Sequence, residues 1–157
     1  MQRMAYWLMK SEPEEFSIDD LKKVRREPWT GVRNYQARNY MWKEMQPGDG
    51  VLFYHSNCPV PGVAGLARVV GEPEPDPTQF QPDSDYHDPK SASDNPRWWL
   101  RHVAFERKFK RVVPLDQLRA EAEALGDFAL LRRGNRLSIL PVTDAQWAHI
   151  LQLAGER

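Results

Sequence analysis

Gly48-Asp-Gly-Val-Leu-Phe-Tyr-His-Ser-Asn57 carries the clearest strand pattern of this chain. Successive side chains of a strand point to opposite faces, so Val51, Phe53 and His55 share one face and the residues between them share the other. Residues 56–62 contain two prolines and a glycine and must form a tight connection. The segment therefore predicts a strand over 51–55 that is followed by a turn.

The segments on either side of this strand alternate irregularly between extended and helical patterns. Strands are expected at 6–9, 63–70, 98–113 and 136–142, and helices at 17–26, 35–44, 115–125, 127–133 and 143–154. Gly65 favours a bulge or a close backbone approach. Arg107 falls on the apolar face of the strand expected over 98–113, which favours a bulge or an exposed edge. Helical crossovers are too few for a doubly wound sheet. We therefore expect an α+β fold, a small mixed or antiparallel β-barrel with helices around it.

Length and composition are those of one globular domain covering residues 1–157. Hydrophobic residues make up 41% of the chain and charged residues 28%. No apolar run approaches the roughly 18 residues that span a bilayer, and the N-terminus lacks a secretory signal, so no membrane partner is expected. A single cysteine fits a reducing compartment, which predicts a cytoplasmic location. We expect a monomer, although a net charge of zero also permits association.

Charge is unevenly distributed along the second half of the chain. Residues 73–95 hold six acids and one base, whereas residues 97–111 hold six bases and one acid. The two blocks could face each other or solvent, or the basic block could follow a phosphate backbone. The long loop over 73–96 is expected to be functional or mobile, because loops of this length are uncommon in compact domains.

The segment Trp29-Thr-Gly-Val-Arg-Asn-Tyr-Gln-Ala-Arg-Asn39 has the composition of a pocket rim. Asn34 is a candidate N-cap, and the helix start behind it offers free backbone N–H groups to an anionic or polar ligand. Arg33 adds a planar cation suited to phosphate, and Trp29 adds a face on which a base could stack.

Other aromatic and polar residues at the ends of predicted elements extend this candidate site. Splayed nucleobases are recognised by aromatic stacking together with hydrogen bonds along the base edge. The π-faces are Trp29, Tyr54, His55, Trp98 and Trp99, and the polar groups are Lys10, Ser11, Arg33, Asn34, Ser56 and Asn57. In an extended Trp98-Trp99 pair the rings point opposite ways, so one of them lines the pocket. The remaining tryptophans, Trp7, Trp42 and Trp147, are expected in the core.

Catalytic, metal and cofactor signatures are weak or missing from the sequence. The four histidines are scattered, one cysteine cannot supply a structural zinc set, and no Walker-type loop occurs. His55 and Cys58 lie three residues apart, but such a cysteine beside prolines fits a buried filler better than a nucleophile. No metal, no cofactor and no catalytic residue are expected.

Six blocks of this sequence resemble the EVE domain family, a relative of the PUA and YTH folds. They follow the family's order, and the similarity runs from Tyr6 to about Leu153. The blocks are residues 6–13, 29–39, 48–57, Asp85-Tyr-His-Asp-Pro-Lys90, Pro96-Arg-Trp98 and 136–142. The resemblance implies a PUA-like β-barrel with peripheral helices and a pocket for a nucleobase.

The same resemblance implies nucleic acid as the partner, with 5-methyl- or 5-hydroxymethylcytosine in DNA as the leading ligand. Carried over by position, it implies a base pocket made by Lys10, Ser11, Trp29, Arg33, Asn34, Tyr35, Tyr54, His55, Ser56, Asn57 and Trp98 or Trp99. Phosphates would be held by Arg33, Arg97 and Lys108. Two other hypotheses stay open, a PUA-like module that reads structured or modified RNA and an enzyme acting on a nucleotide.

Overall fold

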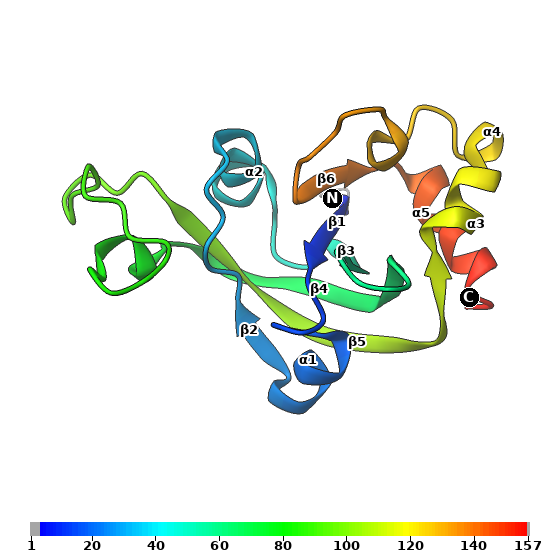
Figure 1. The fold of residues 1–157 in the computed structure, drawn as a ribbon, viewed down its shortest axis with the longest axis horizontal. Coiled ribbons are helices and arrows are strands. Elements are labelled where there is room, and N and C mark those ends of the chain that lie inside the picture. Colours follow the sequence, from blue (N-terminus) through cyan, green and yellow to red (C-terminus); the bar gives the residue numbers. More distant parts are fainter. Residues whose placement is uncertain (1–3, 157) are drawn as a thin grey trace.

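A mixed six-stranded sheet organises the computed structural model, which describes residues 4–156 (Figure 1). The strands lie in the order β2-β5-β4-β3-β1-β6; β1 and β3 run parallel and every other neighbouring pair is antiparallel. Their bounds are β1 Tyr6–Ser11, β2 Arg26–Pro28, β3 Gly50–His55, β4 Gly62–Pro75, β5 Trp99–Pro114 and β6 Ile139–Val142. The α+β prediction is confirmed.

The predicted closure of the sheet into a barrel is wrong. Among the described strands, β2 pairs with β5 alone and β6 pairs with β1 alone, so the two edges do not meet. β2 has three residues and contains Pro28, and β6 has four and contains Pro141. Proline cannot donate to a ladder and is confined to edge strands, so short proline-bearing edges leave the sheet open.

Three of the described helices, α1, α2 and α5, begin with a side-chain cap. Ser17 and Thr143 each form a capping box, and the Asn34 side chain accepts a hydrogen bond from the Ala37 N–H at 3.0 Å. The elements are α1 Ile18–Val24, α2 Tyr35–Asn39, the π-helix η1 Tyr40–Glu44, the 3₁₀ turn η2 Pro77–Phe80, α3 Leu115–Ala120, α4 Ala122–Leu125, the 3₁₀ turn η3 Ala129–Leu131 and α5 Asp144–Leu153. Within residues 4–156 no helix is long and apolar enough to cross a bilayer.

Two hydrophobic clusters cover the two faces of the sheet, as strand alternation requires. Trp7 and Phe53 belong to the first cluster, which includes residues of α1, α2 and η1. Leu8 and Tyr54, which follow them in sequence, belong to the second cluster, which includes residues of α3, α4 and α5. Figure 1 shows α3, α4 and α5 gathered at one end, with the β4–β5 connection extending at the other.

Both irregularities expected in the long strands are present. The register between β3 and β4 shifts beside Gly65, where an added Cβ would lie 2.3 Å from the Arg107 carbonyl oxygen. On β5, Arg107 pairs with Leu66 and Phe105 pairs with Ala67, so one residue is extra on β5. Bulges of this kind bend the strand that carries the extra residue.

Candidate functional site

A cavity of about 560 Å³ opens where β1 ends. Its walls come from four stretches of chain that are distant in sequence: the end of β1 with the following turn, β2 with the segment after it, the start of the turn after β3, and the approach to β6. The β4–β5 connection adds one residue at the rim. The lining residues are Lys10, Ser11, Glu12, Glu15, Phe16, Glu27, Pro28, Trp29, Thr30, Gly31, Val32, Arg33, Ser56, Tyr86, Arg136 and Ser138.

Five of the predicted base-pocket residues line this cavity and seven do not. Those that line it are Lys10, Ser11, Trp29, Arg33 and Ser56. Those that lie elsewhere are Asn34, Tyr35, Tyr54, His55, Asn57, Trp98 and Trp99. The structure therefore brings together the β1 end and the Trp29 segment, whereas Trp98 lies behind the rim, with its ring centroid 5.2 Å from the Arg33 guanidinium.

Trp29 belongs both to the core and to the cavity wall. Only 9% of the residue is exposed, and its ring meets Phe53 edge to face with ring centroids 5.6 Å apart. Most of the indole therefore belongs to the hydrophobic core, and the remainder borders the cavity. Packing of this kind fixes the ring orientation before any ligand arrives.

Two oppositely charged side chains that line the cavity have no hydrogen-bond or ion-pair partner within residues 4–156. Lys10 is half-buried and makes no hydrogen bond or ion pair with any described residue, and burial lowers the pKa of its ammonium group. Glu27 is also partly buried and forms no hydrogen bond or ion pair within residues 4–156. Burial raises the pKa of its carboxyl, against a smaller opposite effect of His102. The cavity therefore holds a free donor group and a free acceptor group.

Arg33 stabilises the cavity rim through hydrogen bonds and an ion pair to the β4–β5 connection. Its guanidinium contacts the buried Asp76 carboxylate at 3.3 Å, the Thr78 hydroxyl at 2.9 Å and the Tyr86 carbonyl oxygen at 2.6 Å. These bonds tie the segment after β2 to the β4–β5 connection, more than 40 residues away. The phosphate-binding role predicted for Arg33 has to compete with this network.

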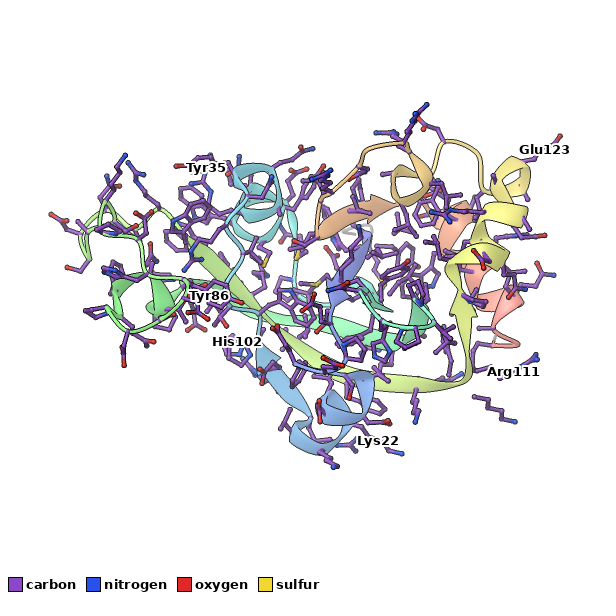
Figure 2. All side chains as sticks on the ribbon, in the orientation of Figure 1. Lys22, Tyr35, Tyr86, His102, Arg111 and Glu123 are labelled. Carbon is purple, nitrogen blue, oxygen red and sulfur yellow. The ribbon has the colours of Figure 1, made fainter. Side chains whose placement is uncertain are left out.

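Tyr86 closes one side of the cavity. Its ring lies against Gly31, where an added Cβ would sit 2.8 Å from the ring carbons and where the backbone φ is +82°. The Gly31 N–H donates to Asp76 at 2.8 Å. Only glycine fits this close approach at a positive φ. Figure 2 shows Tyr86 at the side of the molecule that carries the β4–β5 connection.

The predicted aromatic residues Tyr35, Trp98 and Trp99 belong to two ring stacks outside the cavity. Tyr35 stacks on Trp98 with centroids 4.9 Å apart, and Trp99 stacks on Trp42 at 4.7 Å. The Trp98 indole N–H donates to Asp88 at 2.7 Å, and this bond lowers the pKa of the Asp88 carboxyl. The adjacent tryptophans thus point to different neighbours, as their alternation requires, but neither borders the cavity.

The residues expected from the β3 end have structural partners. His55 Nε2 accepts a hydrogen bond from the Ile18 N–H at 3.1 Å, and burial lowers the pKa of its imidazole. The Asn57 amide donates to Glu12 at 2.6 Å. Tyr54 is 3% exposed and packs in the second cluster, on the opposite face of the sheet.

The two other residues predicted to hold phosphates remain accessible but have acidic neighbours. Arg97 lies 3.9 Å from Asp88, and Lys108 pairs with Asp19 at 2.7 Å. Their side chains are 40% and 46% exposed. The Arg97–Asp88 pair supports the interpretation in which the acidic and basic blocks face each other.

Sequence reasoning missed Glu27, Tyr86 and Arg136 as lining residues. Tyr86 and Arg136 do lie in blocks that resemble the family, and that was the available signal. Glu27 follows a basic pair in an unremarkable stretch, and it lines the cavity as part of the short strand β2. Among the described residues no group of three His, Cys, Asp or Glu side chains is placed to hold a metal ion.

Comparisons with known proteins agree on one family. The EVE domain model matches residues 5–153. Thymocyte nuclear protein 1 of Homo sapiens is 42% identical, over 95% of this chain and 73% of its own length. A crystal structure of the human protein in complex with 5-methylcytosine containing DNA has a TM-score of 0.91 and 41% identity, covering 98% and 99% of the two chains. A Pseudomonas putida protein of known structure has a TM-score of 0.92 and 48% identity, covering 96% and 99%.

The cytoplasmic location expected from composition is contradicted by these relatives. The proteins of Danio rerio and Homo sapiens, 44% and 42% identical to this chain, are named as nuclear proteins. A single cysteine indicates a reducing compartment, which the cytoplasm and the nucleus share, so the inference was too narrow.

The resemblance seen in six sequence blocks is confirmed over nearly the whole chain. The family model spans residues 5–153, which include every stretch that lines the cavity, and the human relative aligns with 95% of this chain. This chain belongs to the EVE domain family.

Proposed function

We propose that this chain is a non-enzymatic DNA-binding module that holds one flipped, 5-modified cytosine in the cavity at the end of β1. The observation that carries the proposal is the human relative's structure with 5-methylcytosine containing DNA, which matches 98% of this chain. The cavity adds independent support, because its lining includes the Trp29 indole together with the polar side chains of Lys10 and Ser11.

The energetics of a flipped base are compatible with this site. Extruding a base costs a few kcal/mol, and stacking on one aromatic ring returns roughly 1–3 kcal/mol. A cavity of about 560 Å³ is within the usual range for small ligands. A 5-methyl group adds about 0.8 kcal/mol if it reaches an apolar surface such as Phe16 or Pro28. The expected preference for the methylated base is therefore several-fold.

The absence of catalysis is part of this proposal. His55, three residues before Cys58, uses its Nε2 to accept the Ile18 N–H, so this nitrogen is not available to that thiol as a base. We further propose that residues 1–157 act as a single module whose open sheet is related to PUA-like folds. Both clusters pack on the same sheet, which supports one folding unit.

The test replaces the indole while keeping the core filled. We expect Trp29→Leu to bind a duplex with one 5-methylcytosine about tenfold more weakly, because stacking is lost. Trp42→Leu, the matched control, removes an indole that stacks on Trp99 outside the cavity and should bind as the original protein does. Affinities are measured by fluorescence anisotropy, and thermal melting checks that both variants fold.

The ligand panel separates the competing hypotheses. Duplexes with 5-methyl-, 5-hydroxymethyl- or unmodified cytosine are compared with a methylated RNA of the same sequence. Equal affinity for modified and unmodified DNA would refute the proposal. Tighter binding to the RNA would favour the RNA-reading alternative.

A further inference from the structure

A module that reads 5-methylcytosine meets a chemical problem that stacking cannot solve. Thymine carries the same 5-methyl group on a ring of the same shape, so an indole and an apolar niche attract both bases about equally. The bases differ at position 4, where cytosine has an amino donor and thymine has a carbonyl acceptor, and at N3, where cytosine has an acceptor and thymine an N–H donor. A hydrogen-bond acceptor beside position 4 therefore selects cytosine.

Three carboxylates line the cavity, and one of them is suited to this task. Glu12 already accepts a hydrogen bond from Asn57 at 2.6 Å, and Glu15 is exposed to solvent. Glu27 is partly buried and has no hydrogen-bond or ion-pair partner within residues 4–156. A carboxylate accepting from the cytosine amino group is an established form of base readout.

Glu27 also lies beside the stacking surface. It is two residues before Trp29, and the backbone stays paired with β5 across this stretch because Glu27 pairs with Val103 and the Trp29 N–H donates to Arg101. Residues two apart on an extended strand face the same side, about 6–7 Å apart. A base resting against the Trp29 indole would thus have the Glu27 carboxylate near its edge.

Lys10 supplies the complementary group. An ammonium donates hydrogen bonds and accepts none, and both cytosine and thymine carry an acceptor carbonyl at position 2. Lys10 has no partner among the described residues, so it can donate to that oxygen in either base. Lys10 would therefore add affinity without choosing between the bases.

We propose that Glu27 is the residue that makes this cavity select 5-methylcytosine over thymine, by accepting the hydrogen bond of the exocyclic amino group. With thymine in the cavity, the carboxylate would face a carbonyl oxygen and two acceptors would be left unpaired. The inference rests on the proposed function and adds a specificity-determining residue to it.

The experiment compares the two bases without a pairing difference. Duplexes carry 5-methylcytosine, thymine or unmodified cytosine opposite an abasic site, so that no base pair has to be broken. Binding is measured by fluorescence anisotropy at pH 8, where the carboxylate is ionised. The unaltered protein should bind 5-methylcytosine about tenfold more tightly than thymine, the range for one good base contact.

Variants separate selection from affinity. Glu27→Gln should bring the ratio of the two affinities near one, because a carboxamide can donate or accept. Lys10→Met should weaken both complexes by a similar factor and leave the ratio unchanged. Glu123→Gln is the matched control: the residue is exposed on α4, at the opposite end of the molecule from Tyr86 (Figure 2), and the variant should keep the full ratio.

Each outcome has a distinct meaning. The inference is overturned if the unaltered protein binds both bases equally, if Glu27→Gln keeps the ratio, or if Glu12→Gln or Glu15→Gln removes it instead. In those cases a retained preference for 5-methylcytosine over cytosine would leave the proposed function standing. Loss of that preference as well would refute both.

Discussion

Asp76 is the residue on which the cavity rim depends. Its carboxylate is fully buried, accepts from the Gly31 N–H and the Thr78 N–H, each at 2.8 Å, and faces the Arg33 guanidinium. A buried carboxylate is stable only when hydrogen bonds and an opposite charge compensate its lost hydration. The acidic block around it could face the basic block or solvent, but Asp76 itself is buried.

We expect Asp76→Asn to reduce the free energy of unfolding by about 2–3 kcal/mol, because Arg33 loses its counter-charge and one amide hydrogen faces other donors. Urea denaturation measures the change. Asp83→Asn, an exposed acid in the same connection, should change stability by less than about 0.5 kcal/mol. Equal effects of the two substitutions would show that the buried network contributes nothing special.

For single residues, the sequence indicated which side chains could line a cavity better than it indicated their contacts with distant parts of the chain. Trp29, Lys10 and Ser11 could be assigned to a cavity because they sit where elements begin or end. Tyr86 could not, because its place depends on the bonds of Arg33 to a loop more than 40 residues away. Trp98 does not border the cavity, because it donates to Asp88 and stacks on Tyr35, contacts that no local pattern indicates.

At the scale of elements, α1 begins with two caps from different parts of the chain. Ser17 bonds the Asp20 N–H within the capping box, and His55 at the end of β3 accepts the Ile18 N–H. The second bond requires an unprotonated imidazole nitrogen. Burial lowers the pKa of His55 from its usual value, which favours that neutral form in the folded protein.

This contact predicts a pH dependence of stability. Between the lowered pKa of the folded state and the unfolded value of about 6.5, the unfolded chain binds more protons than the folded protein. The free energy of unfolding therefore falls as pH decreases through this window, and the contribution of His55 is fully present above it. Urea denaturation at pH 7.5 and 5.5 should show a smaller acid-induced loss for His55→Gln than for the unaltered protein. His87→Gln, an exposed histidine, is the control and should keep the original loss. An unchanged loss in His55→Gln would exclude the histidine as the titrating group.

Local sequence signals predicted where helices start but not how one of them continues. The helix expected over 35–44 begins at Asn34 but becomes a π-helix at Tyr40. The buried Arg101 on β5 donates to the Met41 and Met45 carbonyl oxygens, which binds this turn to the sheet. The spacing of apolar residues in this helix does not reveal its contact with a guanidinium 60 residues away, so the sequence alone could not predict the π-helix.

At the scale of the whole molecule, a net charge of zero limits what phosphate attraction can contribute. Affinity then depends mainly on the base cavity, with a small number of phosphate contacts. If Arg97 and Lys108 make two of these contacts, the logarithm of the affinity falls by about 0.9 per contact for each unit of log salt concentration.

We expect Arg97→Gln and Lys108→Gln each to lower the magnitude of this salt slope by about one while keeping the preference for 5-methylcytosine. Anisotropy titrations at several salt concentrations measure both quantities. Arg119→Gln, on exposed α3, should leave the slope unchanged. An unaltered slope in all three variants would mean that other cations contact the backbone.

The pairing of β1 with β6 has a consequence for biosynthesis. Tyr6 lies opposite Val142, so β1 pairs with a strand that is synthesised more than 130 residues later. Until that segment leaves the ribosome, β1 presents a row of unpaired backbone groups, the kind of edge that recruits other chains. A nascent polypeptide stalled before Ile139 should accordingly be more prone to aggregate, or to engage chaperones, than one released after Val142.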